Sequence, residues 1–175
     1  VRNVPETFFG TVVDDPYRYF EEVTAPEVAT WMTAHSDHAQ ATLRAIPGRD
    51  ALRRRIEQLD ASAPARVTEV TRVPSGQVFY QRRGARDDQF KLYVRDGLGG
   101  RERLLFDPER LRQATGKPQA INYYSPSPDG RWVAVGVSAA GSEDASLRFI
   151  DVASGRQVGP DIDRARFGAA SWSPD

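Results

Sequence analysis

The spacing of apolar residues along the chain changes near residue 62. Before that point, apolar side chains recur every three or four positions, which is the period of one face of an α-helix. We expect a helix that ends at Pro47 and Gly48, followed by a second, shorter helix. The positions on the first helical face are Val28, Trp31, Met32, His35, Ala39, Leu43 and Ile46, and those on the second are Leu52, Ile56 and Leu59.

The first helix carries a start signal. Thr24 is a residue type that caps helices, Pro26 falls in the first turn, and Glu27 follows three residues after the threonine. In a capping box the threonine oxygen accepts a backbone N–H, and the glutamate side chain reaches back to the cap residue. We therefore expect a capping box at the start of this helix.

After residue 64 the period becomes two, which is typical of β-strands. The candidate strands are short, rich in aromatic and branched residues, and separated by turns that contain glycine. They cover residues 77–81, 90–95, 102–106, 131–137 and 146–152, with a further beginning at 157–159. This part of the chain is therefore predicted to be all-β and antiparallel.

A turn sequence recurs within the predicted strands. Residues 127–130 read Ser-Pro-Asp-Gly, residues 173–175 repeat Ser-Pro-Asp, and residues 73–76 read Val-Pro-Ser-Gly, a degenerate copy. Proline presets one turn position, aspartate bonds its own backbone and glycine accepts a positive φ, so the turn is structural. Units of about 50 residues with four short strands are typical of β-propeller blades. We expect two blades, the approach to a third, and a chain truncated from a longer protein, because propellers need about four blades or more.

Composition excludes several functional classes. Lys and Arg total 24, as do Asp and Glu, so the net charge is zero and no basic excess points to nucleic acid. No apolar run approaches the roughly 18 residues of a membrane span, and no apolar segment of a signal peptide follows the first residues.

No catalytic group stands out. A Gly-x-Ser-x-Gly nucleophile elbow is absent, and without cysteine a thiol nucleophile or thiolate zinc site is excluded. His35 and His38 lie three apart on the predicted helix and lack a third ligand, so we expect His35 in a core or interface and His38 at the surface. We expect no catalytic residue, no metal and no cofactor in this chain.

Several segments in order resemble the prolyl oligopeptidase family. Residues 15–22, Asp-Pro-Tyr-Arg-Tyr-Phe-Glu-Glu, followed by Trp-Met-Thr-Ala-His at 31–35, resemble the opening of that family, which usually reads Asp-Pro-Tyr-Arg-Trp-Leu-Glu-Asp. The segments similar to its first blade are 78–80, 92–96 and 105–108, those similar to its second are 127–131 and 136–143, and 170–175 resembles the opening of its third. The resemblance runs from about residue 10 to the end of the chain.

This resemblance implies a serine peptidase of two domains. In the family, an α/β-hydrolase domain with a Ser-Asp-His triad is covered by a seven-bladed propeller that admits only short peptides. Residues 1–65 would then be the helical amino-terminal segment of the hydrolase domain, and residues 66–175 blades one and two with the start of blade three. The fold class is an α+β fragment in which these helices precede antiparallel blades. The triad would lie further along, so this chain alone is expected to be inactive, whereas the full-length protein would hydrolyse short peptides on the carboxyl side of proline.

The resemblance also implies two substrate contacts. Glu143 matches an acidic residue after Gly-Ser in the second blade that faces the active site, and the adjacent Asp144 leaves the register open by one. Phe167 matches a phenylalanine that lines the pocket for the residue beyond the proline. The alternatives are a solvated turn carboxylate and a blade-packing aromatic, respectively.

Two other functions remain open at this point: a non-catalytic propeller that binds a partner, and a related oligopeptidase that cuts after basic residues. The leading interpretation implies short proline-containing peptides as partners, no nucleic acid, no membrane and a monomer when full length. It places the protein in the cytoplasm, with the periplasm left open.

Overall fold

A computed structural model describes residues 2–166, 168 and 170–173 of the chain. The chain divides into two compact units, residues 1–58 and 59–175. The first unit opens with an antiparallel hairpin of β1 (Val4–Phe8) and β2 (Thr11–Asp15), which the sequence pattern did not predict. A 3-10 turn at Arg18–Glu21 leads into helix α1 (Pro26–Arg44), and α2 (Arg49–Asp60) follows.

The predicted capping box at the start of α1 is wrong. The N-cap residue is Ala25, and no side chain caps the helix. The Thr24 hydroxyl donates instead to the Glu22 carboxylate, and Glu27 pairs with Arg2 at 3.4 Å. Because Pro26 at the first turn has a preset φ and no N–H to satisfy, the helix begins one residue later than the threonine pattern implies.

The helical spacing is confirmed, but α1 buries little of its apolar face. Among the described residues of α1 only Val28 is buried, whereas Trp31 is 43% exposed. The His35 ring stacks on the Trp31 indole with centroids 3.7 Å apart, so His35 lies beside an aromatic side chain while remaining exposed. His38 is exposed, as expected.

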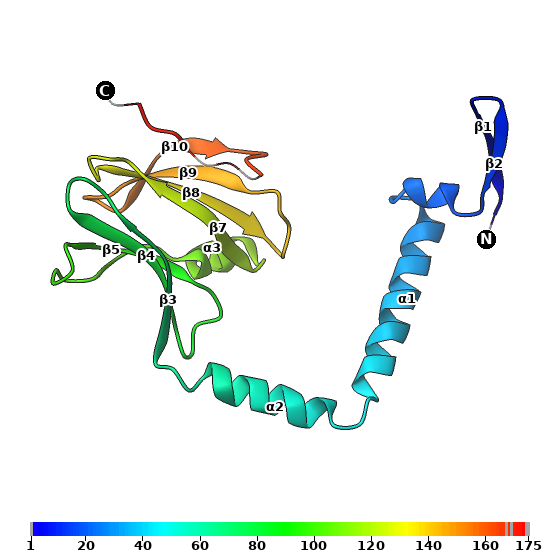
Figure 1. The fold of residues 1–175 in the computed structure, drawn as a ribbon, viewed down its shortest axis with the longest axis horizontal. Helices are drawn as coiled ribbons and strands as arrows, with labels where there is room; N and C mark the ends of the chain where they lie inside the picture. The colour runs from blue at the N-terminus through cyan, green and yellow to red at the C-terminus, as the bar shows by residue number, and fades with distance from the viewer. Residues whose placement is uncertain (1, 167, 169, 174–175) are drawn as a thin grey trace. The chain divides into compact units, whose positions relative to one another are not determined.

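The second unit consists of two four-stranded antiparallel sheets, each a simple meander (Figure 1). The pairing confirms the two predicted blades, each built from four consecutive strands. The first sheet is β3 (Ala65–Arg72), β4 (Gln77–Gly84), β5 (Lys91–Asp96) and β6 (Arg103–Phe106). The second is β7 (Gln119–Pro126), β8 (Trp132–Ala139), β9 (Ser146–Asp151) and β10 (Arg156–Ile162).

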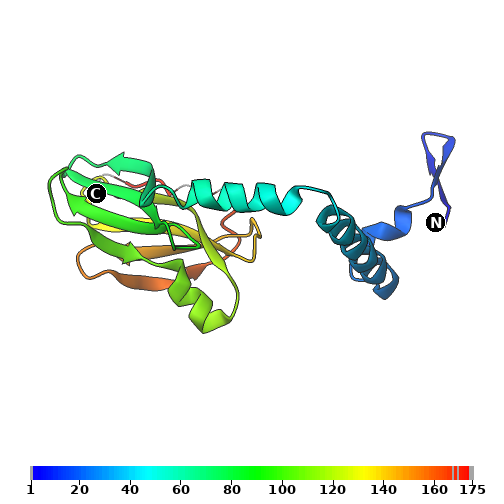
Figure 2. The same cartoon turned by 90° about the horizontal axis from the view of Figure 1, so that it is seen from below.

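The hydrophobic core lies between the two sheets, which are stacked as layers (Figure 2). Alternate residues of neighbouring strands point into it, as the period of two requires. The buried members are Val73, Phe79, Leu92, Val94, Leu105, Val133, Val135, Val137, Ile150 and Val152. Each sheet thus packs one face against the other, and residues of β4 and β8 that point away from this core, such as Tyr80 and Ala134, are buried as well.

The Ser-Pro-Asp-Gly turn has the expected structural role. Asp129 accepts hydrogen bonds from the Ser127 hydroxyl (2.6 Å) and the Arg131 N–H (3.0 Å), and Gly130 has a φ of 70°. The degenerate copy forms the same turn, because the N–H of Gly76 bonds the Val73 carbonyl at 2.9 Å, just as Gly130 bonds Ser127. The repeat in the sequence therefore corresponds to a repeat in space.

Several regular elements besides the hairpin were missed or only partly predicted: β3, β7, the second half of β10, and helix α3 (Pro108–Thr115), which connects the two sheets. The signals for α3 are present in the sequence. Asp107 caps it by accepting the Glu109 N–H, Pro108 occupies the first turn, and Gly116 ends it with a φ of 71°. The helix is only eight residues long, so its apolar period is hard to distinguish from that of the flanking strands.

Candidate functional site

The loops that connect the strands lie alternately at the two ends of the strands. We call the end at which the first strand of each sheet begins the entry edge, and the other end the opposite edge. The segments at this edge are residues 59–64, 85–90, 107–118 and 140–145, and the chain after β10 returns to it. The opposite edge carries the structural turns at 73–76 and 127–131. Because the two sheets are equivalent, their entry-edge loops lie at matching positions.

Backbone hydrogen bonds hold the entry edge together in the same way in both blades. The Ala85 N–H bonds the Pro64 carbonyl at 3.2 Å, and the Ala140 N–H bonds the Pro118 carbonyl at 2.8 Å. In each case the loop after the second strand is tied to the segment that precedes the first strand. The edge is therefore a supported surface and not a row of free loops.

The last residue of α2 is fixed to the first blade by a double ion pair. Arg83 donates through Nη2 to both carboxylate oxygens of Asp60, at 3.0 and 2.8 Å, and Arg66 Nη2 lies 2.7 Å from the same carboxylate. Arginine holds a carboxylate in a fixed geometry through its planar set of donors. This contact sets the point where the chain enters β3.

A second ion-pair group links the β4–β5 loop to the segment before α3. Lys91 Nζ lies 3.1 Å from Asp87 and 3.5 Å from Asp107. The Gly84 N–H and then the Lys91 ammonium lower the pKa of Asp87, and the hydrogen bond to Asp87 raises the pKa of Lys91. Both groups thus stay charged over a wide pH range and keep this part of the edge ordered.

The sequence left open whether Glu143 or Asp144 matches the acidic residue of the family. The structure gives the two side chains different surroundings. Asp144 is engaged by Arg166, whose Nε and Nη2 lie 2.9 and 2.5 Å from Oδ1. Glu143 is exposed, and its carboxylate has no partner among the described residues. Both lie in the β8–β9 loop at the entry edge, so Glu143 is the carboxylate that is available to a ligand there.

Phe167 lies outside the described residues. The segment just before it returns to the entry edge: the Ala165 N–H bonds the Ala145 carbonyl at 2.8 Å, and the Tyr123 hydroxyl donates to the Ala165 carbonyl at 2.7 Å. Glu143 and the segment that leads to Phe167 therefore both lie at the entry edge of the second blade.

The described residues contain no group of three or more His, Asp or Glu side chains arranged to hold a metal ion. No helix in the described part of the chain combines the length and the apolar character needed to cross a bilayer. The anchoring pairs Asp60–Arg83 and Asp144–Arg166 were missed from the sequence, because partners about 22 residues apart leave no local signal.

Comparison with known proteins places this arrangement in one family. Residues 1–175 match the family profile described as prolyl oligopeptidase, N-terminal beta-propeller domain. The chain is 26% identical over 175 residues to the prolyl endopeptidase of Elizabethkingia meningoseptica, covering 97% of this chain and 23% of that protein.

Solved structures agree with the match. A prolyl endopeptidase from a study of inter-domain dynamics in two such enzymes superposes with a TM-score of 0.85 and 34% identity, over 98% of this chain and 25% of that one. Prolyl oligopeptidase B of Galerina marginata shares the fold, with a TM-score of 0.66 and 21% identity over 92% of this chain and 25% of its own. The chain thus spans about a quarter of the length of these relatives, and it belongs to the prolyl oligopeptidase N-terminal β-propeller family.

Proposed function

We propose that the protein is a serine-type oligopeptidase that hydrolyses short peptides on the carboxyl side of proline, and that this chain supplies its propeller side. The observation that carries the proposal is the match of nearly the whole chain to a prolyl endopeptidase structure at 34% identity and a TM-score of 0.85. The reaction would be acyl transfer, with a serine nucleophile, a histidine base and an oxyanion hole supplied by residues beyond this chain.

The finer architecture is part of the same proposal. Residues 1–65 would complete an α/β-hydrolase domain, and the two blades would be the first of a seven-bladed ring that limits access to short peptides. In its support, α1 and α2 keep exposed apolar side chains such as Leu43 and Leu52, 52% and 62% exposed, which a further domain would cover. The two sheets pack face to face through one shared core, as neighbouring blades of a propeller do.

Within this function we assign substrate contact to Glu143 and Phe167. The entry edge supports the first assignment, because the Glu143 carboxylate is exposed there without a partner while its neighbour Asp144 is engaged by Arg166. An exposed carboxylate at the mouth of a site attracts the positively charged amino end of a peptide. Phe167 would provide an apolar wall for the residue after proline.

The experiment is to express the protein as its gene encodes it and to assay a chromogenic Gly-Pro reporter. Cleavage after proline that is blocked by a serine-directed phosphonate supports the proposal. The 175-residue chain alone is expected to be inactive in the same assay. Absence of cleavage by the whole protein, in a folded preparation, would contradict the enzyme function.

Two alternatives are tested with the same preparation. A faster reaction with an Arg reporter than with the Gly-Pro reporter would indicate the related specificity for basic residues. A folded protein that cleaves neither reporter, but binds proline-containing peptides, would indicate a non-catalytic binding module.

A further inference from the structure

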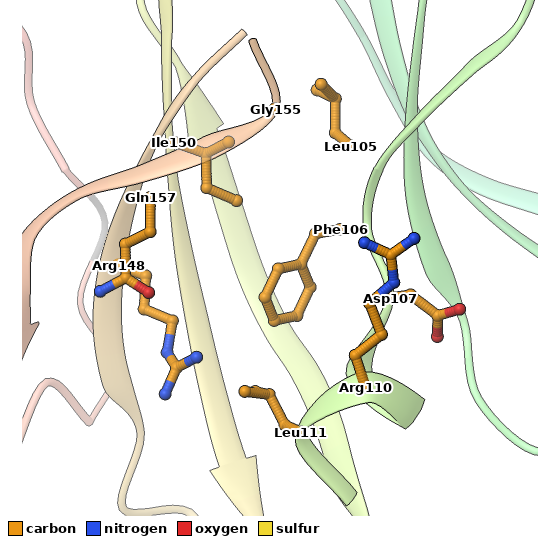
Figure 3. Close-up of a pocket in the computed structure, with 9 residues that line it drawn as sticks. All are labelled: Leu105, Phe106, Asp107, Arg110, Leu111, Arg148, Ile150, Gly155 and Gln157. Carbon is orange, nitrogen blue, oxygen red and sulfur yellow. The ribbon is translucent and has the colours of Figure 1, made fainter. Parts of the chain in front are cut away.

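A pocket of about 170 Å³ lies between the two sheets beside α3. Figure 3 shows its walls: Phe106 and Leu111 on the side of β6 and α3, and Ile150 on the facing strand β9. These side chains make the middle of the pocket apolar. The volume is close to that of a cavity of about 150 Å³ that holds benzene.

Two guanidinium groups come from opposite walls of this pocket, Arg148 from β9 and Arg110 from α3 (Figure 3). Arg148 is held by Asp161, whose carboxylate lies 2.6 Å from Nη2. Its Nε is buried and has no hydrogen-bond partner among the described residues. A buried donor without a partner is unfavourable, so a rearrangement of this side chain that brings Nε to an acceptor in the pocket would be favoured.

The Arg110 guanidinium, unlike that of Arg148, has no ion pair among the described residues. It also has no hydrogen bond with any other residue in the described part of the chain. Two residues along the same helix, Arg112 pairs with Glu109 at 3.1 Å and with Asp88 at 3.6 Å. The available carboxylates of α3 and its surroundings are thus used by Arg112 and not by Arg110.

The polar groups that could neutralise these arginines are already committed. Asp107 accepts the Glu109 N–H at 3.0 Å and pairs with Lys91 at 3.5 Å. The Gln157 amide nitrogen donates to the Gly159 carbonyl and to Asp161. The pocket therefore combines an apolar middle with one unpaired guanidinium, that of Arg110, and one nitrogen of Arg148, Nε, that lacks a hydrogen bond.

We propose that this pocket binds a carboxylate joined to an apolar group of about the size of a benzene ring. The apolar group lies against Phe106 and Ile150, and the carboxylate is bound by the guanidiniums of Arg148 and Arg110, because charged donors in a partly dry pocket favour an anion. The same chemistry is present in a free aromatic acid and in the carboxy-terminal phenylalanine of a peptide. This site lies between the blades and is independent of the peptidase proposal.

Binding is tested on the protein as its gene encodes it, by calorimetric titration with phenylacetate and with the neutral phenylacetamide. We expect saturable phenylacetate binding and at least about ten-fold weaker phenylacetamide binding, the loss expected for one charge-assisted hydrogen bond. Arg110→Gln and Arg148→Gln, made singly, should weaken phenylacetate binding by a similar factor. Arg112→Gln, on the same helix but paired outside the pocket, is the matched control and should bind as the unmodified protein does.

Arg110 is exposed, so its variant keeps the fold even if Arg148→Gln, which loses the Asp161 ion pair, does not. A loss confined to one variant assigns the carboxylate to that guanidinium and supports the proposal.

A titration with Ala-Ala-Phe and its amide distinguishes the two ligand sources. Tighter binding of the free-acid peptide than of phenylacetate points to the end of a peptide, and the reverse order points to a small acid. No saturable binding up to about 10 mM phenylacetate, equal binding of phenylacetamide, or unchanged binding in both pocket variants would overturn the proposal.

Discussion

The hydroxyl of Tyr124 on β7 donates a hydrogen bond to the Phe79 carbonyl on β4, 3.1 Å away, and so joins the two blades. The same hydroxyl reaches the Glu69 carbonyl and lies 3.3 Å from the Thr71 hydroxyl. Glu69 has a φ of 50° at a register shift between Thr68 and Thr71, where the ladder of β3 is interrupted. The single proton of the phenol is thus shared between carbonyl groups that lie at a bulge in the neighbouring sheet.

Tyr124→Phe is expected to destabilise the protein by about 1–3 kcal/mol, because the inter-blade hydrogen bond of this hydroxyl is lost while the ring packing remains. The measurement is the apparent unfolding temperature by scanning calorimetry. Tyr17→Phe is the control, since Tyr17 is 53% exposed and contacts Phe20 through its ring. Equal unfolding temperatures for the two variants would show that the inter-blade hydrogen bond contributes nothing.

Stability is expected to fall as the pH rises from 10 to about 12. Burial, followed by the hydrogen bond to Glu102, raises the pKa of Tyr80 from 10.0 to about 12. The unfolded chain releases this proton near pH 10 and the folded chain keeps it, so the contribution is complete below pH 10 and is lost toward pH 12. Urea unfolding at pH 9 and pH 11.5 measures the slope.

Tyr80→Phe removes the titrating group and should flatten this slope, although the variant starts from a lower stability because its bond to Glu102 is lost. Part of the slope should persist, since burial also raises the pKa values of Tyr93 and Tyr124. A slope identical to that of the unmodified protein would contradict the role given to Tyr80.

Gly136→Ala is expected to cost about 1–3 kcal/mol. A Cβ on Gly136 would lie 2.2 Å from Cζ of the Tyr123 ring, and that ring is held in place by the bond of its hydroxyl to Ala165. The control is Gly99→Ala, because a Cβ there meets nothing within 4 Å. The measurement is the thermal unfolding temperature of both variants. Equal temperatures would mean that the Tyr123 ring moves aside at no cost and would contradict the prediction.

Glu143→Gln is expected to lower kcat/KM for short peptides by about two- to ten-fold without abolishing activity, the range of an exposed charge interaction. The effect should shrink with added salt, because an exposed charge is screened. Asp96→Asn is the matched control, since it removes an exposed carboxylate at the opposite edge of the first blade. Peptide kinetics that change equally in both variants, or in neither, would remove the assignment.

Phe167→Ala should raise KM or lower kcat/KM for peptides with a large residue after proline, and leave those with glycine there nearly unchanged. The physical reason is the loss of apolar contact area, which matters only when the substrate fills it. The ratio of kcat/KM for the two peptides is the measurement, and an unchanged ratio would indicate that Phe167 serves blade packing alone.

The local parts of the fold were predictable from the sequence. Strands β5, β6, β8 and β9 fall within one or two residues of their predicted ranges, because alternation of apolar residues depends only on the side chains of the strand itself. The turn at Ser127 was also predictable, since its hydrogen bonds close within five residues. The helical cap at Thr24 was not, because a proline next to it shifts the helix start.

What the amino-acid order decides alone is therefore the period, the turns and the repeat of two blades, together with the order of motifs that resembles the family. Which carboxylate is free and which is engaged was decided only by the tertiary structure: Asp144 meets Arg166 and leaves Glu143 exposed. The burial of Arg148 Nε without a partner is likewise a property of the folded chain. These properties depend on partners far apart in the chain, and no pattern of neighbouring residues specifies the distance between them.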